Sequence, residues 1–361
     1  MLHGLVLASA LFGSLTPGPH PVGFRMIVET DASRPALPAT ASVTGRTVPI
    51  AVWYPARTTD GRPLRLRDYV VFGEQALTGI EPGDTRAPIE AFLAGPLGRG
   101  LSRADLDRLL DTEGIAIRNA VPAAGRFPLV LFAHASVETE SVTCEYLASY
   151  GYVVAAVRSR GTTDVAYRLS RENLDAMVAD HDFAAARMQR EAYVEPGAVG
   201  VIGMSNGSIA GVALQMKRAV SAIVSLDGGI GENAGGTYLR ERSDGDIARL
   251  GAPILHLYAP NNSYLNLEHL RSYRAAPRTL AFVRGMRHGD FLAYPAFDRL
   301  APGFSGDASA DALAGFVWVN RYTLHFLDAW LQRSTHGTRF MAATAESQGA
   351  PAGLMTLERL P

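Results

Sequence analysis

The residues around Ser205 give the clearest indication of chemistry in this chain. Ser205 is the centre of the pentapeptide Gly203-Met204-Ser205-Asn206-Gly207, with an apolar run at 199–202 before it and another at 209–216 after it. Gly-x-Ser-x-Gly between a strand and a helix is typical of a nucleophile elbow, a tight turn that presents a serine hydroxyl above the edge of a sheet. The same pentapeptide also fits an ordinary flexible loop, so partners for Ser205 decide between the two interpretations.

A serine hydroxyl is a weak nucleophile and needs a histidine to accept its proton. In a strand-turn-helix setting the expected chain order is serine, acid, histidine, which excludes the four histidines that precede Ser205. Of the later ones, His256 lies in a strand-like run, and three others lie in helical patterns or a polar segment: His269, His325 and His336. His288 remains, in a turn-rich segment after the apolar run 279–283, and we predict that it is the base.

The best candidate for the acid is Asp227, which ends the apolar run 221–226 and precedes Gly228-Gly229. The equivalent turn one strand later, at 259–263, contains no carboxylate, and asparagine cannot carry the charge that stabilises an imidazolium. Three other aspartates are better explained as loop or turn residues: Asp244, Asp246 and Asp290. A purely turn-forming role for Asp227 is the alternative.

An oxyanion hole requires two main-chain N–H groups, one just after the nucleophile and one in an early strand-to-helix loop. The apolar strand 128–133 leads into a helical pattern from about 138 to 150. We therefore expect the amides of Asn206 and Ser136 to be the donors. On this interpretation His134 shapes the loop and carries no proton.

Several of these segments together resemble a known family. The chain is similar to α/β-hydrolases related to platelet-activating-factor acetylhydrolases and to bacterial dienelactone-hydrolase-like serine esterases. The resemblance extends from about 17 to 331 and is carried by the segments 17–23, 50–56, 128–136, 145–157, 199–208, 226–227 and 285–291.

This resemblance implies a Ser205, Asp227, His288 triad and ester hydrolysis with no metal and no organic cofactor. The chain departs from the family pattern at Asn206, at Ser208, where the family has a second glycine, and at Ala135, where it has glycine. Dienelactone hydrolases proper use a cysteine nucleophile, but the only cysteine here, Cys144, lies in the helical pattern well before the elbow. A lactone-specific activity is therefore disfavoured.

Strand-like and helical patterns alternate along the 361 residues, which predicts an α/β-hydrolase fold with a mainly parallel central sheet flanked by helices. With 47% hydrophobic residues, one large domain over 17–361 is favoured over two. The net charge of −1 gives no reason to expect a nucleic-acid partner. A single cysteine excludes an internal disulfide, and no metal-ligand cluster is evident.

The region from about 72 to 114 lies before the oxyanion strand and contains the capped helical pattern 102–110. It is interpreted as a helical insertion, either a surface addition or a cap over the active site that selects the acyl group. A second region, 229–245, is rich in glycine and polar residues and is expected to be a loop that borders the pocket.

The first 16 residues have the apolar core of a signal peptide but no Lys or Arg before Arg25. They are either a signal peptide, in which case the protein is exported, or a leading strand or disordered start of a cytoplasmic protein. No other stretch is long and apolar enough to span a membrane.

The predicted function is serine-dependent hydrolysis of carboxylic esters through an acyl-enzyme, with small-molecule or lipid-like esters as substrates. Two alternatives stay open. The same residues suit other acyl transfers, such as perhydrolysis or peptidase activity. The departures at Asn206, Ser208 and Ala135 also allow a binding protein of this fold without turnover.

Overall fold

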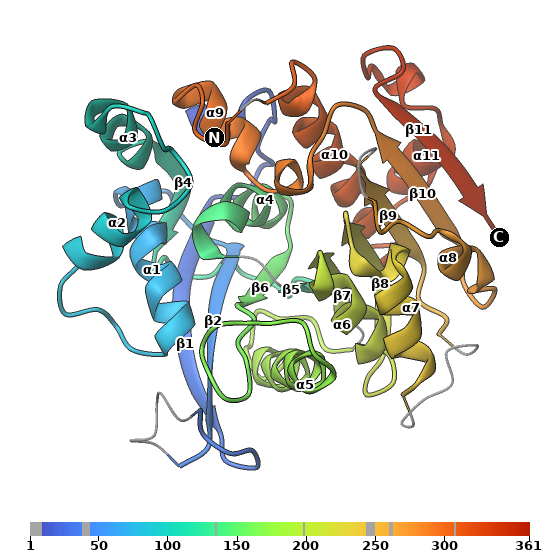
Figure 1. The fold of residues 1–361 in the computed structure, drawn as a ribbon, viewed down its shortest axis with the longest axis horizontal. Coiled ribbons are helices and arrows are strands. Elements are labelled where there is room, and N and C mark those ends of the chain that lie inside the picture. Colours follow the sequence, from blue (N-terminus) through green and yellow to red (C-terminus); the bar gives the residue numbers. More distant parts are fainter. Residues whose placement is uncertain are drawn as a thin grey trace.

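A sheet of eleven strands crosses the whole molecule (Figure 1). The computed structural model of the chain describes residues 9–37, 44–133, 136–197, 199–242, 250–259, 263–306 and 308–361. The strand order is β11-β10-β9-β8-β7-β5-β6-β2-β1-β4-β3. The strands are β1 (Val22–Asp31), β2 (Arg46–Pro55), β3 (Pro63–Arg65), β4 (Glu113–Arg118), β5 (Leu129–Ala133), β6 (Val153–Val157), β7 (Val199–Met204), β8 (Val220–Leu226), β9 (Ile254–Tyr258), β10 (Arg278–Val283) and β11 (Met355–Leu360).

The six central strands, from β6 to β10, run parallel, whereas β2 and β11 join this block in antiparallel orientation. Every residue of β5, β6 and β7 is buried, because helices cover both faces of the sheet. The carboxyl ends of these strands meet at one edge, where ligands bind in open parallel sheets. The predicted central sheet with flanking helices is confirmed.

Helices lie on both faces of the sheet (Figure 1). One face packs against α1 (Leu66–Thr78), α3 (Arg103–Leu110), α4 (Val137–Ser149), α9 (Tyr294–Leu300), α10 (Ala312–Trp330) and α11 (Thr335–Ala342). The other packs against α5 (Arg171–Met188), α6 (Asn206–Leu214), α7 (Asn233–Arg240) and α8 (Glu268–Ser272). The helix α2 (Arg86–Leu93) contacts α1, and short 3₁₀ turns include η1 (Ala10–Phe12), η3 (Gly229–Gly231), η5 (His288–Phe291) and η6 (Glu346–Gln348).

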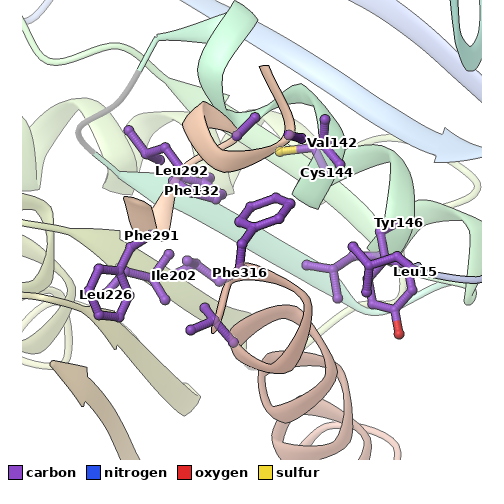
Figure 2. Packing of buried hydrophobic residues seen from close by; sticks show 14 of the residues in the cluster. Leu15, Phe132, Val142, Cys144, Tyr146, Ile202, Leu226, Phe291, Leu292 and Phe316 are labelled. Atoms are coloured by element: carbon purple, nitrogen blue, oxygen red, sulfur yellow. The ribbon is translucent and has the colours of Figure 1, made fainter. Parts of the chain in front are cut away.

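The core on the α4 and α10 face is built from large apolar side chains of distant segments. Phe316 of α10 lies in the middle of this group, between sheet residues such as Ile202 and helix residues such as Val142 (Figure 2). Phe316, Ile202 and Phe291 are each at most 1% exposed. Burial of each such side chain contributes about 1.5–3 kcal/mol, so this layer holds α10 and the segment after His288 firmly on the sheet.

Residues 66–118 form α1, α2, α3 and β4, and a buried side chain anchors them to α4. Glu145 of α4 accepts a 2.7 Å hydrogen bond from the main-chain N–H of Ile115 and another from the Tyr69 hydroxyl. Burial raises the pKa of Glu145 to about 7, against these hydrogen bonds, which lower it. That the region from about 72 to 114 is an insertion acting as a cap stays a prediction.

One local expectation was wrong. Residues 229–240, expected to be loop, form η3 and α7, because Ile230 and Leu239 are fully buried against α6 and α5. Here tertiary burial organises residues whose own helix propensity is weak. His336, in the polar segment 334–337, lies in α11, whose first turn is capped by the Ser334 hydroxyl.

The segment 9–16 is packed against the body of the protein. Leu11, Phe12 and Leu15 are each at most 2% exposed and join the core beneath α9. Whether residues 1–16 act as a signal peptide stays a prediction. No helix in the described part of the chain is long and apolar enough to cross a membrane.

Candidate active site

Ser205 lies on a strained turn between β7 and α6. Its φ of +52° is rare for a residue with a side chain. A Cβ on Gly203 would lie 2.3 Å from the nitrogen of Ser208, and one on Gly207 would lie 2.2 Å from the oxygen of Ala133. Both glycines of the pentapeptide are therefore required by close backbone approaches, as expected of a nucleophile elbow.

The strained turn is held by hydrogen bonds to the carbonyl oxygen of Ser205. It accepts from the Ser208 hydroxyl at 2.8 Å and from the main-chain N–H groups of Gly229 at 2.9 Å and Ser208 at 3.1 Å. The Ser208 hydroxyl also accepts from the N–H of Ile230 at 3.2 Å. Ser208 thus connects this turn to the segment after Asp227 through hydrogen bonds.

Asp227 and His288 are joined by a hydrogen bond of 2.6 Å between Oδ2 and Nδ1. Asp227 follows β8 and is 2% exposed, whereas His288 starts η5 and its side chain is 52% exposed. A carboxylate that accepts from Nδ1–H fixes the tautomer in which Nε2 is free to accept a proton. The structure therefore brings the predicted acid and base together, with the base reachable by substrate.

The other histidine and aspartate residues that were considered as base or acid do not take part in the contact between Asp227 and His288. His256 is fully buried in β9, where its Nδ1 lies 2.9 Å from the Ser225 hydroxyl. Burial lowers its pKa to about 4, against the charge of nearby Asp227, which raises it. Asp290 accepts from the N–H of Arg287 at 2.7 Å and shapes the turn, as expected. Asp244 and Asp246 lie outside the described residues.

The two predicted oxyanion donors stand at helix starts. Asn206 is the first residue of α6, and Ser136 is the N-cap of α4. Neither main-chain N–H donates a hydrogen bond to any described residue. Free N–H groups at helix N-termini favour negative charge. His134 and Ala135, which precede Ser136, lie outside the described residues.

Thr139 connects the loop of Ser136, a predicted oxyanion donor, to the segment that carries His288, the predicted base. Its N–H and its hydroxyl both donate to the carbonyl of Ser136, at 2.9 and 3.0 Å, and its own carbonyl accepts from the N–H of Ala293 at 2.9 Å. Sequence reasoning missed Thr139, and a hydroxyl three residues after a helix N-cap was the only local signal for it.

Two cavities open at the carboxyl edge of the sheet on either side of this site. The first, of about 470 Å³, includes Ser205, Asn206, Asp227 and His288 in its lining. The second, of about 440 Å³, includes Ser136 and lies above the ends of β5 and β6. Cavities of this size accept small organic molecules.

No cluster of three or more His, Cys, Asp or Glu side chains with metal-binding geometry occurs in the described ranges. Cys144 is fully buried in α4, and burial raises the pKa of its thiol. A neutral, inaccessible thiol is inert as a nucleophile.

The mainly parallel sheet, the helices on both faces and the strained serine turn are consistent with the α/β-hydrolase fold. Among solved structures, the chain is similar to a ferulic acid esterase from Streptomyces cinnamoneus, with a TM-score of 0.63 and 19% sequence identity over 93% of this chain and 96% of the other. At this identity the likeness shows a shared fold. No protein-family model matches the chain, and no curated protein sequence matches it.

Proposed function

We propose that the protein is a serine hydrolase that cleaves carboxylic esters. The observation that carries this proposal is the 2.6 Å bond between Asp227 and His288 beside the same cavity that Ser205 lines. Ser205 has a positive φ, and its carbonyl oxygen accepts three hydrogen bonds. Such a fixed, strained conformation is not expected of an ordinary flexible loop. The fold shared with a ferulic acid esterase agrees with ester chemistry.

In the proposed reaction, Nε2 of His288 takes the proton of the Ser205 hydroxyl as Oγ attacks the ester carbonyl. The carbonyl oxygen becomes an oxyanion, which accepts from the amides of Ser136 and Asn206. His288 returns the proton to the departing alcohol, and an acyl-enzyme remains on Ser205. Water, deprotonated by His288, then releases the carboxylic acid and restores the serine.

Other acyl transfers on the same residues are distinguished by their products. Peroxide in place of water gives a peracid, and an aminoacyl amide substrate gives a free amine. A binding protein without turnover retains ligand and releases no acid. We also propose that, among such enzymes, the protein is related to acetylhydrolase-like and dienelactone-hydrolase-like serine esterases.

The test is hydrolysis of 4-nitrophenyl acetate by the wild-type protein and by Ser205→Ala. Loss of the triad serine reduces kcat by several orders of magnitude in serine hydrolases, and we expect a loss of at least about 1,000-fold. Ser272→Ala, which removes an exposed hydroxyl that donates only to a main-chain carbonyl, is the matched control. Equal activity of Ser205→Ala and wild type would overturn the proposal.

A further inference from the structure

The second cavity is lined by apolar and hydroxyl-bearing side chains and, among the described residues, by one charged group. Leu77, Val165, Ala166 and Leu292 are its apolar residues, Tyr294 adds an aromatic ring, and Arg158 is the charged residue. Leu77 comes from α1, and Arg158 directly follows β6. An apolar cavity of about 150 Å³ already holds benzene, so 440 Å³ accepts a considerably larger acyl group.

The position of His288 determines which part of an ester enters this cavity, provided that the proposed function holds. The imidazole must reach the oxygen of the departing alcohol, so the alcohol lies on the side of the first cavity, which His288 lines. The second cavity contains Ser136, the proposed oxyanion donor, and His288 is not among its lining residues. The amide of Ser136 would hold the carbonyl oxygen, so the carbonyl carbon would lie at the border of the second cavity, which is then available to the acyl group.

Most N–H groups of Arg158 have no hydrogen-bond partner among the described residues. In the described part of the chain its one hydrogen bond runs from Nη1 to the carbonyl of Gly73 at 3.2 Å, and it forms no ion pair there. A guanidinium carries five N–H groups, and none of the Arg158 nitrogens is both buried and unpaired. The unused N–H groups are therefore accessible to a ligand in the cavity.

The surroundings of Arg158 favour a neutral oxygen over a second carboxylate. A Cβ built on Gly73 would lie 2.5 Å from Oε2 of Glu138 and 3.8 Å from Nη1 of Arg158. The carboxylate of Glu138 therefore lies near the guanidinium of Arg158, beside Gly73. The Oε2 atoms of Glu138 and Glu140 are buried and have no hydrogen-bond partner among the described residues. The charge of Glu138 would oppose an added anion, whereas a hydroxyl accepts from Arg158 without adding charge.

We infer that the second cavity is the acyl subsite and that Arg158 selects acyl groups with an apolar, ring-sized body and a neutral hydroxyl at the far end. Arg158 is then a specificity-determining residue that touches the substrate away from the reacting carbonyl. A hydrogen bond to a charged donor contributes enough for at least a tenfold preference.

The test uses four methyl esters, so that the leaving group is constant: acetate, 3-phenylpropanoate, 3-(4-hydroxyphenyl)propanoate and 3-(4-carboxyphenyl)propanoate. The measured quantity is the ratio of kcat/KM for the hydroxylated ester to that for the phenyl ester. We expect a ratio of at least ten in the wild type and about one in Arg158→Met, which keeps the side-chain length. Arg86→Met, at an arginine whose side chain is 86% exposed, is the control and should keep the wild-type ratio.

A wild-type ratio near one, or a higher kcat/KM for the carboxylated ester, would overturn the inference even if Arg158→Met failed to fold. So would a variant that keeps the wild-type ratio. If the acetate ester is cleaved in a Ser205-dependent way, the proposed function survives either result. If none of the four esters, nor 4-nitrophenyl acetate, is cleaved in a Ser205-dependent way, the proposed function itself fails.

Discussion

The main-chain N–H of Ala259 donates a 2.9 Å hydrogen bond to Oδ1 of Asp227 and so leaves Oδ2 for His288. Ala259 follows β9, the strand next to β8, so the sheet itself positions the carboxylate. Asp227 also adopts a φ of +40°, and its N–H donates to the carbonyl of Leu257 at 2.7 Å. The carboxylate of Asp227 is thus held by main-chain contacts in the position from which it binds the imidazole of His288.

Asp227→Asn is expected to lower kcat of ester hydrolysis by about 10³–10⁴-fold, because an amide cannot stabilise the imidazolium and favours the wrong histidine tautomer. The measurement is steady-state hydrolysis of 4-nitrophenyl acetate. Asp84→Asn, at an exposed aspartate whose described hydrogen bonds are to Arg86 alone, is the control and should match the wild type. A kcat within tenfold of wild type for Asp227→Asn would argue against Asp227 as the acid.

Ser208→Ala is expected to destabilise the elbow. The change removes the bond to the Ser205 carbonyl and leaves the buried N–H of Ile230 without its acceptor, which costs about 1–3 kcal/mol. Urea unfolding should show this loss, and kcat should fall with it. Ser272→Ala removes an exposed hydroxyl of the same kind and should change the free energy of unfolding by less than about 0.5 kcal/mol. Equal losses in both variants would mean that Ser208 has no special role.

Gly207→Ala is expected to disturb the same turn sterically. The new Cβ would lie 2.2 Å from the carbonyl oxygen of Ala133, so the backbone has to move, at a cost of about 1–3 kcal/mol or more. Thermal unfolding and esterase activity report the effect. At Gly83 a Cβ meets nothing within 4 Å, so Gly83→Ala should be neutral or slightly stabilising. A fully active, equally stable Gly207→Ala protein would contradict the observed approach of α6 to β5.

Glu140 should make the protein less stable as the pH rises. Burial raises its pKa to about 8, helped by the charge of Glu138 and opposed by that of Arg158. Between its ordinary pKa of 4.5 and about 8, the folded state binds more protons than the unfolded state. The free energy of unfolding therefore falls with rising pH in this window, by at most about 1.4 kcal/mol per pH unit for this group.

Glu140→Gln isolates that contribution, because the amide has no proton to lose. Its stability relative to wild type should improve steadily from pH 5 to pH 8 in urea unfolding experiments. Glu81→Gln, at an exposed carboxylate, should show no such trend. A pH-independent difference between Glu140→Gln and wild type would show that Glu140 ionises normally in the folded protein.

The sequence was sufficient to predict the elements that carry the candidate site, because each has a local signature. The pentapeptide around Ser205 is bounded by apolar runs that form β7 and α6, and Asp227 directly follows an apolar strand. Chain order then selected His288 from the histidines. Each of these signals lies in a short stretch of sequence or in the order of residues along the chain, so periodicity and motif spacing detect it.

The supporting contacts were beyond sequence reasoning because they join distant segments. Ser208 bonds to Ile230, 22 residues away, and Thr139 bonds to Ala293. The helix α7 was missed because its residues are poor helix formers that are stabilised by burial against α5 and α6. The second cavity, with Arg158 at its lining, depends on side chains from five separate segments.

The most direct measurement of the central claim is labelling of the purified protein with a fluorophosphonate, followed by mass spectrometry of the modified peptide. Only an activated serine reacts readily, because the reagent requires a deprotonated hydroxyl and an oxyanion site. A single adduct on Ser205, strongly reduced in His288→Ala, is the predicted result. A folded wild-type protein with no adduct, or with an adduct on another serine, would contradict the account.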